Sequence, residues 1–405
     1  MSGRLGLSLP LGLVTVSHLF SHFYLIALPP LFPLIRADLG VSVAQLGLIM
    51  SVLAAGSLLQ VPVGSVVDRI GARWVAIAGM ALTPLGYILA GAGGGYAWLL
   101  AGAAVSGVGQ SSYHPANYTI IDATADPARL GRSFSIHTFG GTVGFTIAPV
   151  TIGAVALATS WSAAVIAAGV VGIAYAVLFG LLLRVERPAP TASESPDAAP
   201  AGTLRGLLSM RPIMIMAAFF LVINLGLAGV RTYTPLYVID GLALTATVGN
   251  GALSAFFAAS SVSVLIGGYL ADRTDPRANI MAATSVIALA VVGVLLGPAT
   301  PAPWFVIGAI GLAGFGFGLV YSSRDRLVSA VAPAGAAGRS FGMVFTFGAT
   351  GAMISPLALG VLIDLTVVSV AFWLVAGFFL AAGLIVFLTG PTWRGQLRAL
   401  VPIGR

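Results

Sequence analysis

The sequence has no cysteine and no lysine, and it has few charged residues of either sign. Without cysteine there can be no disulfide, no thiolate metal site and no cysteine nucleophile. Charged residues fill 8% of the 405 positions, whereas about 25% is usual for a soluble domain. A polar, water-facing surface over most of the chain is therefore excluded.

Signatures of catalysis are also missing. The sequence contains no Gly-x-Ser-x-Gly elbow, no His-Glu-x-x-His helix and no Gly-x-x-x-x-Gly-Lys phosphate loop. We therefore expect neither an enzyme nor an ATP-driven pump, and no cofactor or metal. The net charge of +7 comes from arginines scattered singly among apolar stretches, so it predicts no nucleic-acid partner.

Long apolar runs dominate what remains, because hydrophobic residues make up 58% of the chain. A helix needs about 20 mostly apolar residues to cross a bilayer. The runs predict an all-α membrane protein of twelve transmembrane helices, six of which precede residue 185. The expected spans are 10–34, 44–64, 74–93, 97–120, 133–155 and 161–183, then 212–239, 247–270, 280–298, 303–328, 340–362 and 368–389.

The chain is expected to consist of two halves. Residues 1–184 and 212–405 each form a six-helix bundle, the second with a short tail, and 185–211 form a Pro-, Ala- and Ser-rich linker. Six spans per half place both termini and the linker on one side, where most loop arginines also fall, against Arg36 opposite. The positive-inside rule makes that side cytoplasmic, in a bacterial inner membrane. We expect a monomer.

The two halves resemble each other in sequence. GRSFSIHTFGGTVGFTIAPVTIG at 131–153 aligns with GRSFGMVFTFGATGAMISPLALG at 338–360 without a gap, at an offset of 338 − 131 = 207. The shared GRSF and the proline in the same register predict an internal duplication.

A loop motif occurs once in each half. GSVVDRIGAR (64–73) and GYLADRTDPR (268–277) both read G-x-x-x-D-R-x-x-x-R, between the second and third expected span of each half. The motif, spans, linker and duplication together resemble the major facilitator superfamily. The resemblance implies alternating access and a pseudo-symmetric two-bundle fold. The first copy departs from the family pattern at Ala72, where a basic residue is usual.

The resemblance also implies a gate at these loops. Asp68 would bind the free N–H groups at Gly338-Arg339-Ser340, and Asp272 would face Gly131-Arg132-Ser133. Such clasps would hold the cytoplasmic ends together in the outward-open state. The expected gating residues are Asp68, Arg69, Arg73, Asp272, Arg273, Arg132 and Arg339. The alternative is that Asp68 only terminates its helix.

Substrate sites in this superfamily lie between the halves, so the resemblance directs attention to the first, fourth, seventh and tenth spans. His18 and His22 share one face of the first span, and His114 lies in the fourth. These histidines are the expected proton carriers, because no acid is embedded in several spans and histidine titrates near neutral pH. For His137 a packing role is the stronger reading.

Two arginines are the expected ligands of an anionic substrate. Arg231 lies in the seventh span and Arg324 in the tenth, and guanidinium groups bind carboxylates in a two-pronged geometry. Arg326 is expected to be an ordinary cytoplasmic charge, and Asp325 to pair with either neighbour. The expected substrate-binding residues are Arg231, Arg324, Tyr321, Asn117, Tyr113, Asn224 and Tyr237.

The sequence therefore predicts a proton-coupled secondary transporter of a small organic anion. The alternative is a proton-driven exporter of drugs or phosphonates, because SYHPAN (112–117) followed by the GRSF helix resembles the fosmidomycin-resistance-type branch. That branch has an acid after His-Pro, where this chain has Ala116. A channel or receptor fits the composition, but the duplicated loop motif argues against both.

Overall fold

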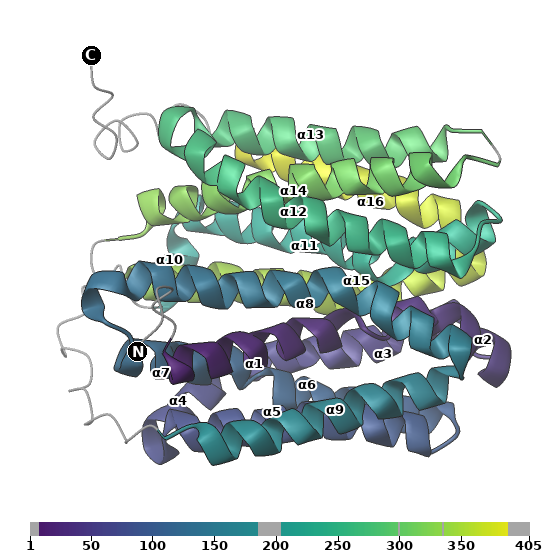
Figure 1. Cartoon of the computed structure of the whole chain (residues 1–405). Coiled ribbons are helices and arrows are strands. Elements are labelled where there is room, and N and C mark those ends of the chain that lie inside the picture. Colours follow the sequence, from purple (N-terminus) through teal and green to yellow (C-terminus); the bar gives the residue numbers. More distant parts are fainter. Residues whose placement is uncertain (1–7, 185–203, 299, 334–335, 388–405) are drawn as a thin grey trace.

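The fold is two bundles of helices that run along one common axis (Figure 1). The computed structural model describes residues 8–184, 204–298, 300–333 and 336–387, and within these ranges no strand occurs. Eleven helical segments are long and apolar enough to cross a membrane. Helices suit that setting because each satisfies its own backbone hydrogen bonds.

The N-terminal bundle holds the first six spans, drawn in purple to blue-green in Figure 1. Its α-helices are α1 (Leu9–Ile26), α2 (Phe32–Leu39), α3 (Val43–Ala55), α4 (Gln60–Ile70), α5 (Ala72–Ala92), α6 (Tyr96–Gln110), α7 (Tyr113–Thr124), α8 (Leu130–Ala158) and α9 (Trp161–Leu182). Short 3₁₀ turns η1 (Pro29–Leu31), η2 (Gly56–Leu59) and η3 (Pro127–Arg129) connect some of them.

The C-terminal bundle is drawn in green to yellow. Its helices are α10 (Leu204–Ser209), α11 (Arg211–Leu236), the π-turn η5 (Tyr237–Gly241), α12 (Ala246–Arg273), α13 (Pro276–Leu295), α14 (Pro303–Val331), α15 (Ala337–Leu365) and α16 (Val368–Phe387). Most of the linker expected at 185–211 lies outside the described residues, and its last part contains the short helix α10.

The fourth span is broken, which explains why eleven segments rather than twelve meet the length criterion. The chain leaves the helix between α6 and α7, at Ser111 and Ser112. Pro115 lies four residues after Ser111, and a proline ring clashes with the carbonyl of residue i−4. Neither piece alone is long enough to cross, but α6 and α7 together occupy the span expected at 97–120. The expected twelve-span architecture is thus confirmed in outline.

Several spans are longer than expected. The first continues to Leu39 through a break at Pro29 and Pro30, where two amide donors are missing. The expected ends were placed where the apolar run stops, but polar helix ends continue past it. The repeated helices α8 and α15 both have 29 residues, and their first residues, Leu130 and Ala337, keep the sequence offset of 207. The duplication therefore extends over the whole helix.

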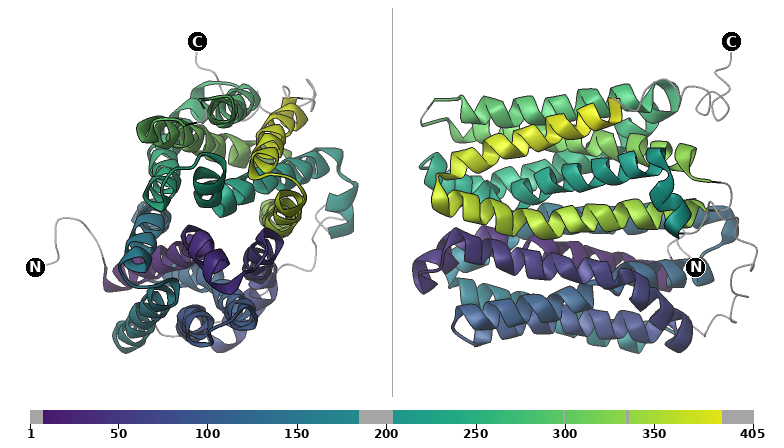
Figure 2. Two further views of the ribbon diagram at one scale, coloured as in Figure 1. Left: turned by 90° about the vertical axis from the view of Figure 1, so that its right-hand side faces the viewer. Right: turned by 180° about the vertical axis from the view of Figure 1, so that it is seen from behind.

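The two ends of the molecule differ. We call the end where α9 stops at Leu182 the linker face, and the opposite end, at Gly40 and Gly241, the far face. Viewed along the axis, the two bundles lie side by side (Figure 2). Helices α3 and α15 contact each other across the boundary, and so do α8 and α12.

Candidate functional site

Two of the expected substrate-binding residues are arginines of the C-terminal bundle. Arg231 is partly buried on α11 and lies close enough to Tyr321 on α14 for electrostatic interaction. No hydrogen bond or ion pair of Arg231 to another described residue is present. A guanidinium group held inside a bundle without an acid is costly, which sets Arg231 apart from the paired arginines.

Arg324 lies one helical turn from Tyr321 on α14. Its guanidinium carbon is 4.2 Å from the centre of the Tyr321 ring and 5.0 Å from that of Phe220 on α11. Its Nε donates to Asp325 at 3.1 Å, and its side chain is 12% exposed. The two rings orient the guanidinium by cation–π attraction. Asp325 therefore pairs with Arg324 and occupies one edge of its guanidinium group.

The other expected substrate-binding residues of the C-terminal bundle, Asn224 and Tyr237, have different surroundings. Asn224 is partly buried and donates its side-chain N–H to the carbonyl of Phe220, one turn earlier on α11. Tyr237 is buried in η5 toward the far face, where it stacks on Phe372 of α16 with ring centres 4.3 Å apart. Asn224 therefore borders the aromatic group around Arg324, whereas Tyr237 packs inside the bundle.

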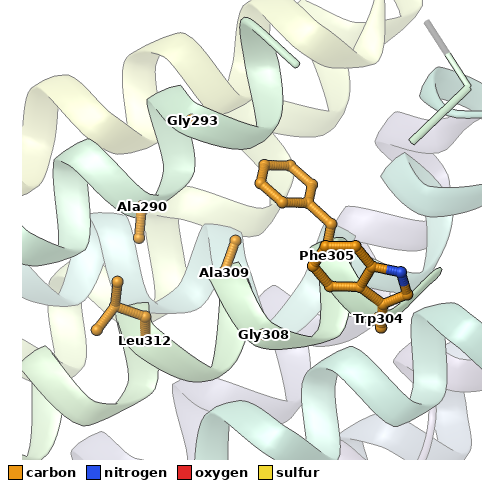
Figure 3. A pocket seen from close by; sticks show the side chains of 7 residues that line it. All are labelled: Ala290, Gly293, Trp304, Phe305, Gly308, Ala309 and Leu312. Carbon is orange, nitrogen blue, oxygen red and sulfur yellow. The ribbon is translucent and has the colours of Figure 1, made fainter. Parts of the chain in front are cut away.

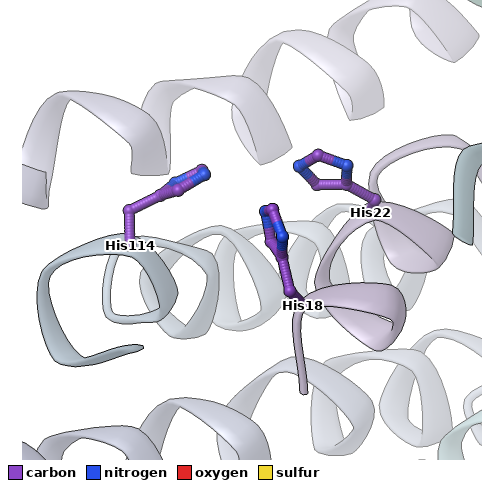
Figure 4. Close-up of side chains that lie close together, drawn as sticks. All are labelled: His18, His22 and His114. Atoms are coloured by element: carbon purple, nitrogen blue, oxygen red, sulfur yellow. The ribbon is translucent and has the colours of Figure 1, made fainter. Parts of the chain in front are cut away.

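Histidines gather in the N-terminal bundle. The rings of His18, His22 and His114 face one another from α1 and α7 (Figure 4). The centre of the His18 ring is 4.2 Å from that of His22 and 5.2 Å from that of His114. His137 of α8 joins them, because its ring is stacked on His18 at 4.1 Å. The structure thus brings the three expected residues together and adds the fourth histidine of the chain.

One hydrogen bond orients His18. Its Nδ1 lies 2.8 Å from the backbone carbonyl of His137, so Nδ1 carries the proton and donates. Its Nε2 then presents a lone pair, and this atom is buried with no hydrogen-bond partner. The Nδ1 of His22 is likewise buried and unpartnered. Buried polar atoms rarely stay unsatisfied without a reason.

Asn117 and Tyr113 have packing roles. Asn117 is fully buried and exchanges hydrogen bonds with Ser17, which joins α7 to α1. Tyr113 lies in the apolar core of the N-terminal bundle, 2% exposed. Gln110 makes a similar pair of bonds with Ser21, which the sequence pattern did not single out. These contacts fix α1 against the fourth span and so hold the histidines in place.

The histidines and the aromatic arginine site occupy equivalent places in the two halves. A Cβ on Gly141 of α8 would approach His22, and a Cβ on the duplicate Gly348 of α15 would approach Asn224. His22 and Asn224 are 224 − 22 = 202 positions apart. The same offset relates His18 to Phe220, on which Arg324 lies. Positions that correspond in the two halves thus carry His18 and His22 in one half, and Phe220 and Asn224 beside Arg324 in the other.

The expected linker-face clasps are not engaged in this conformation. Asp272 binds Arg326 of α14 at 2.9 Å, within its own half. Asp68 is exposed at the end of α4, and no hydrogen bond or ion pair of its side chain to described residues is present. At the starts of α8 and α15, Arg132 is exposed and Arg339 is partly buried.

Two of the remaining motif arginines contact their own half. Arg73 donates to the carbonyl of Gly180 on α9 at 2.9 Å. Arg273 lies over the ring of Tyr269, 3.7 Å from its centre. Arg69 lies exposed on the last turn of α4. All three lie at the linker face.

The halves instead meet toward the far face. Both carboxylate oxygens of Asp364, near the end of α15, accept hydrogen bonds from the first amides of α3, Val43 at 2.9 Å and Ala44 at 2.8 Å. Arg36 of α2 and Asp240 of η5 form an ion pair at 2.6 Å. Sequence reasoning missed Asp364, because an acid near a helix end gives no signal of its distant partner.

An aromatic contact joins the two halves where α8 meets α12. Phe145 of α8 stacks on Phe257 of α12, with ring centres 4.6 Å apart, and on its other side Phe145 stacks on His22 at 4.1 Å. The histidine cluster is therefore in direct contact with a side chain that bridges the two halves.

A separate apolar pocket lies between α13 and α14 (Figure 3). Trp304 and Phe305 border it together with Ala290, Gly293, Gly308, Ala309 and Leu312. Trp304 is 76% exposed. The lining carries no charged side chain, so the pocket belongs to the apolar surface of the bundle and not to the polar site.

The sequence model of the Major Facilitator Superfamily matches residues 14–356 and 252–400. The chain belongs to this superfamily of membrane transporters. The fosmidomycin resistance protein of Escherichia coli K12 is 26% identical over 400 residues, covering 93% of this chain and 92% of that protein. The probable L-galactonate transporter of the same organism is 26% identical over 151 residues, 37% of this chain and 33% of that protein.

Solved structures support the fold. A bacterial homologue of the human lysosomal transporter Spinster, in an inward-facing and occupied conformation, superposes with a TM-score of 0.78 at 14% identity. The match covers 95% of this chain and 97% of that one. Both the major facilitator fold and the family predicted from the loop motif are thus confirmed.

Proposed function

We propose that this major facilitator transporter moves a small organic anion, such as a carboxylate, across a bacterial inner membrane by alternating access. The observation that carries the proposal is Arg231, a guanidinium group inside the C-terminal bundle without an acidic partner among the described residues. Arg324 lies one turn from the shared neighbour Tyr321. Together they can bind an anion in the two-pronged geometry that guanidinium groups favour.

The anion reading is supported by what surrounds these arginines. Asp325 neutralises one edge of Arg324, but Arg231 has no such counterion, so a bound anion would balance its charge. A relative of part of this chain carries the name of a probable galactonate transporter, which is a transporter of a sugar acid.

Orientation follows from the same proposal. With the linker face in the cytoplasm, as the arginine distribution predicts, the far-face contacts close the molecule to the outside and this conformation is inward-facing. In the opposite state Asp68 would reach the start of α15, which is the clasp expected from the sequence. The energy source is a proton gradient, and the role of His18, His22 and His114 as carriers stays a prediction.

A binding screen tests the substrate class. Purified protein is heated with aldonates, alkyl phosphonates or the lipophilic cation tetraphenylphosphonium, and the unfolding midpoint is recorded. An anion that binds the native state raises the midpoint in wild type and not in Arg231→Ala. Stabilisation by the cation alone, unaffected by Arg231→Ala, would contradict the anion proposal.

A drug or phosphonate exporter is the second candidate. It is favoured by the similarity to a fosmidomycin resistance protein over 93% of this chain. Transport into inverted vesicles tests the export part of this candidate, because a proton-driven exporter accumulates its substrate there when the lumen is acidified.

A further inference from the structure

We propose that His18, His22 and His114 form a binding site for a divalent first-row transition metal ion. One ring nitrogen from each of the three lies within 4.8 Å of the others. Figure 4 shows the rings pointing toward a common centre. Neutral imidazole is a ligand that suits zinc, nickel, copper and iron.

Two ring nitrogens of the three histidines have no hydrogen-bond partner among the described residues of the protein. The bond from His18 Nδ1 to the backbone carbonyl of His137 leaves His18 Nε2 as the acceptor, and this atom has no partner in the protein. Metal-binding histidines typically donate their other N–H to a carbonyl in this way, which fixes the tautomer and orients the ring. The unpartnered Nδ1 of His22 offers a second nitrogen.

The neighbouring backbone leaves room for the rings. A Cβ on Gly141 of α8 would lie 2.6 Å from Nδ1 of His22 and 2.7 Å from Cε1 of His18. Glycine is therefore required where α8 passes the cluster. The His22 ring rests on Phe145, which holds it from the far-face side.

The geometry fits an open three-histidine site. Metal–nitrogen bonds of about 2.0–2.1 Å in a tetrahedron place the nitrogens about 3.4 Å apart, so the rings must close inward slightly on binding. Three protein ligands leave a fourth position for water or an anion. The group contains no carboxylate, so an anionic fourth ligand would offset part of the ion's charge in this apolar setting.

His137 is excluded from the ligand set although its ring lies 4.1 Å from that of His18. It does not belong to the group whose ring nitrogens lie within 4.8 Å of one another, although both of its own ring nitrogens are buried without a hydrogen-bond partner among the described residues. Its contribution is the backbone carbonyl, which any residue at this position supplies. His137→Gln is therefore the matched control. The proposal does not depend on the identity of the transported solute.

Cobalt is a suitable probe. The full-length chain, purified without a histidine tag and treated with a chelator, is titrated with Co²⁺ while visible absorption is recorded. The chain has no cysteine, so d–d bands of tetrahedral intensity must arise from nitrogen and oxygen ligands. We expect saturation at one ion per chain and displacement by Zn²⁺.

Single substitutions test which histidines bind the metal ion. His18→Gln, His22→Gln and His114→Gln should each weaken Co²⁺ binding by about 100-fold or more, since loss of a second-shell partner alone costs 10- to 100-fold. His137→Gln should bind as wild type does. The unfolding midpoint of each variant without metal shows whether it is folded. Absence of the bands in wild type, or Co²⁺ affinity in all three variants equal to that of wild type, would overturn the proposal whether or not the protein transports an anion.

Discussion

At the scale of single residues, Arg231 and Arg324 differ in what holds them. Arg324 is oriented by two aromatic rings and by Asp325, whereas Arg231 has only the neighbouring Tyr321. A ligand anion should therefore depend strongly on Arg231 for charge and on Arg324 for orientation.

Arg231→Lys keeps the charge but loses the planar fork. A charge-assisted hydrogen bond is worth about 1.5–3 kcal/mol, so the anion should bind on the order of tenfold more weakly or worse. The measurement is the ligand dissociation constant by calorimetry. Arg129→Lys is the matched control, because Arg129 lies exposed at the linker face in a weak ion pair with Asp126. Unchanged affinity in Arg231→Lys would remove it from the binding site.

Residue types were readable from the sequence, but their partners were not. An arginine or histidine inside an apolar run signals function, because its burial is costly. Asn117 and Tyr113 gave the same signal, yet the structure uses them for packing and for a bond to Ser17. The difference lies in which way each side chain faces across a broken helix, and periodicity along one span does not fix that.

At the scale of elements, close packing of α8 against α1 depends on a missing side chain. A Cβ on Gly141 would fall 2.6 Å from a nitrogen of His22, inside contact distance. On α15, Gly342 has nothing within 4 Å of its Cβ position.

Gly141→Ala should destabilise the protein by about 1–3 kcal/mol, because overpacking forces side chains or backbone to shift. Gly342→Ala should be neutral or slightly stabilising, because alanine is the better helix former by about 1 kcal/mol. Thermal unfolding in detergent measures both. A Gly141→Ala protein as stable as Gly342→Ala would show that the histidine rings are not packed against α8 as described.

The contacts between the two halves at the far face give a second prediction at the scale of elements. Asp364 accepts two backbone hydrogen bonds at the positive end of α3, in addition to the cap by Ser42 on that helix. The Arg36–Asp240 pair is 45% and 37% exposed, and exposed pairs contribute about 0–1 kcal/mol. Asp364 should therefore hold the closed far face more strongly than the ion pair does.

Asp364→Asn should shift the protein toward the state that is open at the far face, by about tenfold or more in population. Asp240→Asn should shift it little, and Asp68→Asn should shift it the opposite way if that acid clasps the linker face. The readout is the labelling rate of a cysteine replacing Ser51, which is buried in the α3–α15 seam. Equal rates in Asp364→Asn and Asp240→Asn would contradict the ranking.

At the scale of the whole molecule, the prediction from twelve spans is that the linker and both chain ends share one side of the membrane. Because the chain has no cysteine, single cysteines report topology without background. Ser209 lies at the linker face and Thr300 in the far-face loop between α13 and α14, both exposed.

Ser209→Cys should be protected from an impermeant thiol reagent in intact cells and labelled after permeabilisation, and Thr300→Cys should be labelled in both. Ser195, in the linker expected at 185–211, lies outside the described residues and can be tested in the same way. Labelling of Ser209→Cys from outside would invert the orientation and make this conformation outward-facing.

The sequence by itself determined the membrane-spanning class, the duplicated halves and the family. Those properties follow from local information: the length of apolar runs, the 207-residue offset and the paired loop motif. Pro115 alone does not predict the break in the fourth span, because Pro84, Pro149, Pro235 and Pro356 lie inside continuous helices.

Only the tertiary structure decided which end of the molecule is closed and which polar groups meet. Asp364 and Val43 are 321 residues apart, and His18 and His137 are 119 apart. Such pairs depend on how rigid helices from different parts of the chain pack against one another. Local sequence pattern reports the faces of a single helix, so it cannot select partners on a distant one.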